Sequence, residues 1–183
     1  ESAANSRVMS LVLKKGLRSR IEEEAVAADL LLCAICEACE LKPPPLPTFN
    51  IDETVSIEFK SVPPTVAQLR AGNHAVVWSH PNGTVTESVP QPPRGLLSGS
   101  FNPLHVGHCR LRSAAEEVIG GAVHFELSLV NADKPPLNNF EIEHRRHQFD
   151  DVALALSGAP RFIDKARLFP GTTFVIGYDT AIR

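Results

Sequence analysis

Residues 95–108 read GLLSGSFNPLHVGH, and the fold class of the chain is predicted from this segment. Its first four residues form a short apolar run, as expected for a buried strand. After the loop, apolar residues recur at helical spacing and a glycine pair ends the pattern: Leu111, Ala114, Ala115, Val118 and Gly120-Gly121. A loop that joins a buried strand to a helix is typical of a βα unit in a parallel sheet.

The sequence after this unit continues the alternation of strands and helices. Alternating apolar residues over 123–129 predict a second strand. Asn138 and Glu141 predict the start of a second helix, whose apolar face consists of Ile142, Phe149, Val152 and Leu156. Residues 172–176 predict a third strand that ends at Gly177. The order βαβαβ predicts an α/β fold with a parallel sheet and right-handed crossovers, one half of a doubly wound fold.

Prolines are concentrated between residues 43 and 93 and divide the chain into three stretches: 1–42, 43–93 and 94–183. The first stretch predicts a strand over 8–13 and a helix that begins near Ser19, where Glu22 completes a capping box. This helix, up to Leu41, is apolar on nearly every face, so we expect it to be buried on several sides. A strand and a helix alone do not make a domain.

The middle stretch, 43–93, opens with the stiff extended linker PPPLP at residues 43–47. Two strand-like runs follow, at 55–59 and 75–78, and in the first of them apolar and polar residues alternate as in a half-buried strand. The second run precedes Pro81-Asn82-Gly83, a turn signal, and a further run at 84–89. We therefore expect a small β-rich element with a hairpin and no chemistry of its own.

The length, charge and composition of the chain limit the classes of protein to which it can belong. The chain has 183 residues, a formal charge of −3 and 43% apolar residues, which allows one ordinary domain or two small ones. The acidic balance disfavours a nucleic-acid partner, and no apolar run is long enough to span a bilayer. The chain starts at Glu1 and has a single methionine, so we expect a processed, trimmed or incomplete start. The sequence favours neither of two cellular compartments, the cytoplasm or an organelle such as a mitochondrion or plastid.

Three of the four cysteines, Cys33, Cys36 and Cys39, have the C-x2-C-x2-C spacing that begins an iron–sulfur sequence. The fourth ligand is missing, and three residues so spaced on a helix fall within an arc of roughly 120°. We therefore expect them to pack in the core as small apolar residues, and we predict no metal site in the chain.

The ten residues GSFNPLHVGH, 99–108, match the pattern GxFNPxHxGH completely. They resemble the HxGH nucleotidylyltransferase superfamily, and within it the nicotinamide or nicotinate mononucleotide adenylyltransferases most closely. The resemblance implies a Rossmann-like domain over 94–183, His105 and His108 as the catalytic phosphate-binding pair, and a nucleotide-binding loop. The residues that it implies for this loop are Gly99, Ser100, Phe101, Asn102 and Gly107. The alternative is that the two histidines only pack or cap the helix.

Two further segments carry weaker resemblances to the same family. Lys134, in the loop after the second predicted strand, matches a cation that family members carry near the phosphates. Gly177 and Asp179 match the family's GxD segment beside the adenosine. The segment 141–147 carries His144, Arg145 and His147, for which we expect a solvated helix face, although Arg145 could reach a substrate phosphate.

The family implies adenylyl transfer from ATP, with Mg²⁺, to the phosphate of a mononucleotide, and release of pyrophosphate in NAD metabolism. The family's ISxTxxR motif, which binds the triphosphate, would lie beyond Arg183. We therefore expect weak or absent catalysis by these 183 residues alone, and a protein partner or missing segment that covers an incomplete sheet. The alternative function is a non-catalytic nucleotide-binding or structural subunit of a larger assembly that retains the HxGH loop.

The amino-terminal stretch resembles a second family. Residues 10–20, SLVLKKGLRSR, followed by three glutamates, look like the last strand and helix of a CinA-like nicotinamide mononucleotide deamidase domain. Its catalytic residues would lie upstream of Glu1, so none is carried over. Other nucleotide-binding signatures are absent from the sequence: GxxxxGK[ST], GxGxxG and KMSKS.

Overall fold

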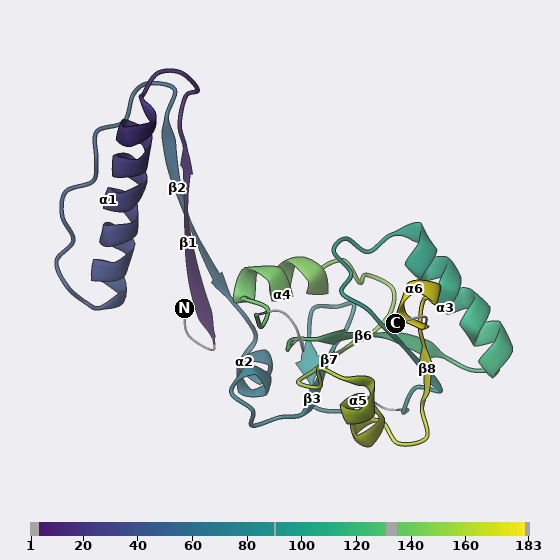
Figure 1. The fold of residues 1–183 in the computed structure, drawn as a ribbon. Helices are drawn as coiled ribbons and strands as arrows, with labels where there is room; N and C mark the ends of the chain where they lie inside the picture. Colours follow the sequence, from purple (N-terminus) through teal and green to yellow (C-terminus); the bar gives the residue numbers. More distant parts are fainter. Residues whose placement is uncertain (1–3, 90, 131–134, 182–183) are drawn as a thin grey trace. The chain divides into compact units, whose positions relative to one another are not determined.

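The computed structural model describes residues 4–89, 91–130 and 135–181. The chain forms two compact units, residues 7–59 and the remainder, which are described separately (Figure 1). The larger unit has an α/β fold with a mixed six-stranded sheet, and it contains the loop at residues 99–105.

The sheet of the larger unit has the strand order β4-β3-β7-β6-β5-β8. Four strands are parallel to one another: β5 (Gly95–Ser98), β6 (Val123–Ser128), β7 (Leu154–Ser157) and β8 (Thr173–Val175). Two strands extend the sheet in the antiparallel sense: β3 (Val76–Ser79), which pairs with β7, and β4 (Val85–Thr86). The central strands are almost wholly buried, because helices cover both faces of a parallel sheet.

The helices begin and end largely where local signals place them. They are α2 (Pro64–Arg70), α3 (Val106–Ile119), α4 (Asn139–Arg146), α5 (Phe162–Leu168) and α6 (Tyr178–Ala181). Gly120 ends α3 in the left-handed conformation, with φ of 68°, that favours glycine. Asn138 and Glu141 form the capping box of α4, in which Asn138 accepts from the Glu141 backbone N–H at 2.9 Å. No helix among the described residues is both long and apolar enough to span a membrane.

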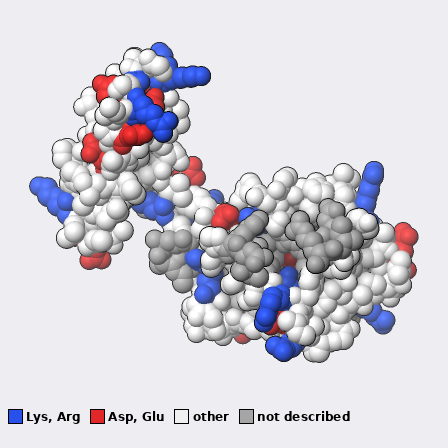
Figure 2. All heavy atoms as spheres, in the orientation of Figure 1, with Lys and Arg blue, Asp and Glu red and all other residues white. Residues whose placement is uncertain are grey.

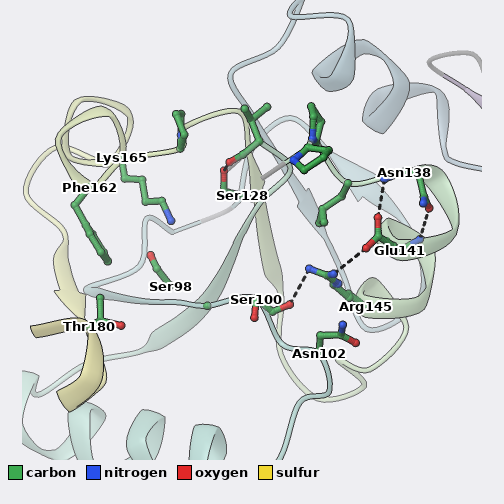
Figure 3. A pocket seen from close by; sticks show the side chains of 16 residues that line it. Ser98, Ser100, Asn102, Ser128, Asn138, Glu141, Arg145, Phe162, Lys165 and Thr180 are labelled. Carbon is green, nitrogen blue, oxygen red and sulfur yellow. Dashed lines mark hydrogen bonds and ion pairs between the residues drawn. The ribbon is translucent and has the colours of Figure 1, made fainter. Parts of the chain in front are cut away.

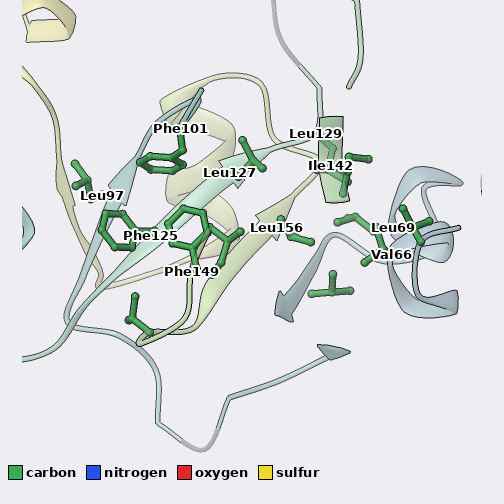
Figure 4. Packing of buried hydrophobic residues seen from close by; sticks show 14 of the residues in the cluster. Val66, Leu69, Leu97, Phe101, Phe125, Leu127, Leu129, Ile142, Phe149 and Leu156 are labelled. Atoms are coloured by element: carbon green, nitrogen blue, oxygen red, sulfur yellow. The ribbon is translucent and has the colours of Figure 1, made fainter. Parts of the chain in front are cut away.

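The hydrophobic core lies on both faces of this sheet. On one face Leu97, Phe125, Leu127 and Leu156 pack with Phe101, Phe149 and Ile142, and with α2 and α3 (Figure 4). On the other face Leu96 and Ala155 pack with Trp78 and Phe169. Because successive residues of a strand point to opposite faces, Leu96 and Leu97 belong to different clusters. The core therefore anchors the carboxyl ends of β5, β6 and β7, where the loop at residue 99 begins.

The predicted single helix across residues 138–156 is wrong. Helix α4 ends at Arg146, residues 154–157 form strand β7, and a further helix, α5, follows at residues 162–168. A short apolar run fits a helix face as well as a strand, and β7 becomes a strand because it pairs with β6 and β3 on its two sides. The predicted order βαβαβ therefore becomes βαβαβαβ.

The hairpin predicted around Pro81-Asn82-Gly83 is confirmed, since β3 and β4 pair in the antiparallel sense. It does not form an element of its own, because β3 joins the large sheet through β7. Strand β2 (Thr54–Ser61), from the same predicted stretch, pairs instead with β1 (Asn5–Val12). The two compact units divide between residues 6 and 7 and between residues 59 and 60.

The smaller unit contains α1 (Arg20–Ala38), and its predicted capping box between Ser19 and Glu22 is confirmed. The expectation that α1 is buried on several sides is wrong. Within this unit the buried side chains of α1 are Val26, Leu30 and Cys33, whereas four large apolar residues are exposed: Ile21, Leu31, Leu32 and Ile35. The expected core packing of the cysteines holds for Cys33 alone, because Cys36 is half-buried and Cys39 is exposed.

Polar contacts join the segments of the smaller unit. The Arg18 guanidinium donates to both carboxylate oxygens of Glu53, at 2.7 Å each, and to the Thr48 carbonyl oxygen. The Glu53 carboxylate also accepts from the Asn50 backbone N–H at 2.9 Å. These hydrogen bonds, above all those from Arg18, lower the pKa of Glu53 from 4.5 to about 2.

Replacing Leu156 tests the packing of the sheet, because its side chain is fully buried on the core face of β7. We expect Leu156→Ala to lower the free energy of unfolding by about 2–5 kcal/mol, through lost apolar burial and the cavity that remains. The control Val118→Ala removes an exposed side chain of α3 and should change stability by less than about 0.5 kcal/mol. Urea denaturation measures both, and similar values for the two variants would contradict the assigned core.

Replacing Arg18 tests the hydrogen bonds between Arg18 and Glu53 in the smaller unit. A carboxyl with a lowered pKa stabilises the fold above its ordinary pKa, and this contribution is lost as the pH falls toward about 2. We expect the Glu53 carboxylate to stay mostly ionised at pH 3 in the wild type and to be mostly protonated there in Arg18→Met. Carboxyl ¹³C shifts report the ionisation state, and Arg20→Met, which removes an exposed partner of Glu24, should leave Glu53 unchanged.

Candidate functional site

The loop after β5 is fixed by the side chain of Phe101. Its ring is 1% exposed and meets Phe125, Phe149 and His108 edge to face, with ring centroids 5.1–5.3 Å apart. Its backbone has φ of 45°, in the left-handed region that a non-glycine residue seldom adopts. Gly99 makes this placement possible, because a Cβ atom there would lie 2.7 Å from the Phe101 ring.

Helix α4 and the residues after it hold the same loop through polar contacts. The Arg145 guanidinium donates to the Ser100 carbonyl oxygen at 3.2 Å. The Gln148 side chain accepts from the Leu104 backbone N–H at 2.7 Å and donates to the Phe101 carbonyl oxygen at 3.1 Å. The expectation of a solvated face at Arg145 is therefore wrong, because this residue is buried and clamps the loop.

His105 and His108 lie at the N-terminus of α3 with their rings stacked, 3.7 Å apart between centroids. His105 is the N-cap, and its Nδ1 accepts from the Gly107 backbone N–H at 3.2 Å. The His108 Nδ1 accepts from the His105 backbone N–H at 3.3 Å. A neutral imidazole that accepts at Nδ1 carries its proton at Nε2, so each ring keeps one N–H for another partner.

The protonation of His108 follows from its surroundings. Burial lowers its pKa from the ordinary value, and the neighbouring His105 lowers it further. The neutral ring, with Nε2–H as a donor, is therefore favoured near pH 7.

The absence of a side chain at Gly107 leaves space for the His105 ring, because a Cβ atom there would lie 3.1 Å from that ring.

A cavity of about 750 Å³ opens beside the loop, at the carboxyl ends of the parallel strands (Figure 3). Ser98, Gly99, Ser100 and Asn102 line it from β5 and the loop. Further lining residues come from three helices and from the N-cap residue of one of them: Asn138 as the N-cap of α4, Glu141 and Arg145 of α4, Phe162 and Lys165 of α5, and Thr180 of α6. A cavity of this size matches those that bind small molecules in other proteins.

The structure brings only part of the predicted site into this cavity. Gly99, Ser100 and Asn102 line it, whereas Phe101 lies in the core below the loop. His105, Gly107 and His108 lie where the loop enters α3 and are not among the lining residues.

The remaining predicted residues lie near the end of β8 or outside the described residues. Gly177 follows β8, and Asp179 lies in α6, the helix from which Thr180 reaches the cavity. Lys134 falls outside the described residues.

Several residues of the site were not predicted from the sequence, among them Ser98 and Lys165 in the cavity, Gln148 beside the loop and Glu126 below it. Lys165 lies at the centre of the short helix α5, and Gln148 follows helix α4. Neither position carries a local sequence signal of a site. Glu126 gave no signal either, because it stands at a polar position of the alternating pattern in β6, between Phe125 and Leu127, where exposure is expected.

In Figure 2 the Lys, Arg, Asp and Glu side chains on the visible face are scattered among neutral residues. The cations of the cavity are instead held individually, Arg145 by Glu141 at 3.2 Å and Lys165 by Glu126 at 2.6 Å. Attraction for an anion at this site is therefore local.

The described residues contain no group of three or more His, Cys, Asp or Glu side chains arranged to hold a metal ion. Mg²⁺ in phosphoryl-transfer sites is bound largely by substrate phosphates and by one or two carboxylates. These residues do not make a metal site by themselves, and the chemistry derived below routes no step through a metal.

No protein-family model, curated protein or solved structure matches the chain. The family resemblance therefore depends on residues 99–108 and on their position in the fold. That position is a loop between the central strand β5 and the N-terminus of α3, beside a cavity.

The tautomer and pKa of His108 test this local geometry. We expect long-range ¹H–¹⁵N spectra to show the proton on Nε2, and the titration midpoint to lie below the ordinary pKa of about 6.5. His105→Asn keeps a capping side chain but removes the neighbouring imidazole, so the midpoint should rise and still remain below the ordinary value. A proton on Nδ1 would contradict the hydrogen bonds to the backbone.

Proposed function

We propose that the larger unit is a Rossmann-like nucleotidylyltransferase domain that transfers an adenylyl group from ATP to the phosphate of a mononucleotide. The observation that carries this proposal is the position of GSFNPLHVGH at the carboxyl end of β5, beside the cavity. The parallel strands have the order β7-β6-β5-β8, so the chain reverses direction across the sheet at β5. Doubly wound folds bind their ligands at such a reversal point.

The reaction requires orientation and charge stabilisation rather than a nucleophile from the protein. An oxygen of the acceptor phosphate attacks the α-phosphorus of ATP, the bond from that phosphorus to the bridging oxygen breaks, and pyrophosphate leaves with the electron pair. The protein holds the two substrates in line and stabilises the charge that develops on the phosphate oxygens.

The residues at the N-terminus of α3 suit the stabilisation of these oxygens. His105 and His108 are fixed by their Nδ1 hydrogen bonds and keep Nε2–H as a donor. The positive end of the α3 dipole lies at the same place, and anions are favoured there. The capping role that was the alternative interpretation therefore does not compete with phosphate binding, because capping occupies Nδ1 and leaves Nε2–H available.

The cavity suits the acceptor mononucleotide. Arg145, with its guanidinium anchored to Ser100, provides a buried positive charge beside the loop, and Asn102 and Ser100 provide further polar groups. These residues would hold the acceptor phosphate next to the histidine pair. Arginine suits this task because its planar guanidinium donates to two phosphate oxygens at once.

His108→Ala tests the proposal in the full-length protein, incubated with ATP, Mg²⁺ and nicotinamide or nicotinate mononucleotide. We expect the wild type to form a dinucleotide and pyrophosphate. Loss of one donor to the transition state should reduce the rate about 10²–10³-fold. Coupled detection of pyrophosphate measures the rate, and circular dichroism checks that the variant is folded.

His144→Ala is the matched control, because His144 is an exposed histidine of α4 that does not line the cavity. Its rate should stay within about twofold of the wild type, as is usual for exposed sites. An unchanged rate for His108→Ala would remove this residue from the mechanism. Absence of transfer to any phosphorylated acceptor by the wild type would overturn the proposed function.

A further inference from the structure

Helix α1 of the smaller unit has a second apolar face, which is exposed. Six exposed residues follow one another at intervals of alternately four and three along the helix and its C-cap: Ile21, Ala25, Ala28, Leu32, Ile35 and Cys39. At about 100° per residue they lie within an arc of roughly 80°, and we call them the outer stripe. Intervals of four and three make the 3.5-residue repeat of helices that pair along their length.

The outer stripe lies on the side of α1 away from its packed face. Three side chains are buried on the packed face: Val26, Leu30 and Cys33. On this face the Cys33 thiol donates to the Pro44 carbonyl oxygen at 3.5 Å, and Glu37 forms an ion pair with Arg7 of β1. The contacts of the smaller unit therefore leave the outer stripe exposed, and an apolar stripe of this length in water is typical of an interaction surface.

The outer stripe is complementary to itself in an antiparallel pair of α1 helices. With a two-fold axis level with residue 30, each stripe residue faces a stripe residue of the other copy. The facing residues are Ile21 and Cys39, Ala25 and Ile35, and Ala28 and Leu32. Each of these pairs combines a large side chain with a small one, so the two surfaces interdigitate. A contact of this kind is isologous, as in most homodimers.

A parallel pair of helices fits less well. It would place every stripe residue against its own copy, so the alanines would leave voids while Leu32 and Ile35 would be crowded. The three glutamates of the first turn, at residues 22–24, would also meet their copies, and like charges repel. In the antiparallel pair these glutamates lie beside the last turn of the other helix, where the facing side chains of Cys36 and Ala38 are uncharged. Shape and charge therefore both favour the antiparallel orientation.

The length of α1 sets the size of this contact. Its 19 residues span about 28 Å, and a helix with its side chains is about 10 Å wide. A helix pair of this length buries about 1,000 Å² in total, which is near the lower limit for a specific interface. Leu31 is exposed beside the stripe and meets its own copy near the axis, which adds apolar area. An interface of this size is consistent with micromolar affinity.

We propose that two copies of this chain dimerise through the outer stripe of α1, as an antiparallel helix pair with two-fold symmetry. None of the residues that line the cavity at the loop belongs to α1, so the inference goes beyond adenylyl transfer and is independent of it. One contact opposes the pairing, because Asp29 is exposed on the flank of the stripe and meets Asp29 of the other copy near the axis.

Analytical ultracentrifugation of the wild-type chain and of Leu32→Glu tests the interface. We expect the wild type to dimerise in the micromolar range and Leu32→Glu to weaken dimerisation at least about 30-fold, because each copy brings a charge into the apolar contact. Ala27→Glu is the matched control, since it adds the same charge to an exposed residue of α1 outside the outer stripe. It should dimerise like the wild type within about threefold. Circular dichroism checks that both variants are folded.

Asp29→Asn tests the position of the two-fold axis. Loss of the repulsion between the two copies should tighten the dimer about threefold, and high salt should reduce this difference. An affinity equal to that of the wild type, or weaker, would contradict the proposed pairing.

Ile21→Cys tests the antiparallel orientation. The new thiol would face Cys39 of the other copy, so mild oxidation with diamide should give a covalent dimer on a non-reducing gel. The two native Cys39 residues lie about 27 Å apart in the antiparallel pair, which is too far for a disulfide. Ile21→Cys combined with Cys39→Ser is the control and should remove the cross-link.

The outcomes decide the inference without reference to catalysis. A wild-type chain that stays monomeric at the highest soluble concentration overturns it, including one whose outer stripe takes a helix of another protein. A dimer of wild-type strength in Leu32→Glu, or a wild-type dimer cross-linked through Cys39, overturns it as well. All of these results leave the proposed adenylyl transfer standing.

Discussion

The burial of the Phe101 ring is the interaction on which the site depends. The ring packs against Phe125 and Phe149 in the core, and this draws the loop after β5 down onto the end of the sheet. The same ring touches His108, so the start of α3 is placed by the core as well. Because packed interiors tolerate little change in shape, the position of the loop is fixed as firmly as that of the strands.

This packing has a conformational cost that other residues offset. Phe101 adopts a positive φ, which a side chain normally disfavours, and Gly99 must lack a Cβ atom to leave space for the ring. Arg145 and Gln148 also donate hydrogen bonds to the carbonyl oxygens of the loop. A loop fixed by both core packing and hydrogen bonds is preorganised, so binding of a ligand would require little further ordering.

Local features could be predicted from the sequence, whereas features that depend on distant segments could not. Helix-start signals involve residues about three apart, so the capping box of α1 and the start of α4 at Asn138 and Glu141 were correctly predicted. Strand β7 was wrongly predicted as part of a helix, because a short apolar run fits both structures until β6 and β3 pair with it. In the candidate site, the loop between β5 and α3 was predicted from ten consecutive residues. The Lys165–Glu126 pair spans 39 residues, and only the fold brings it together.

The cavity shows how a chain with net charge −3 can bring two cationic side chains to one site. Helices α4 and α5 pack on opposite faces of the sheet, and each brings one cation to the carboxyl edge of the strands. Each cation is held by a carboxylate, Arg145 by Glu141 and Lys165 by Glu126, so the overall charge of the site stays low. The Glu126 carboxylate is fully buried while the Lys165 ammonium faces the cavity, so under the proposed function the orientation of the ion pair, more than its net charge, would favour an anion there. Fixed dipoles of this kind select an anion by position and need no broad basic surface.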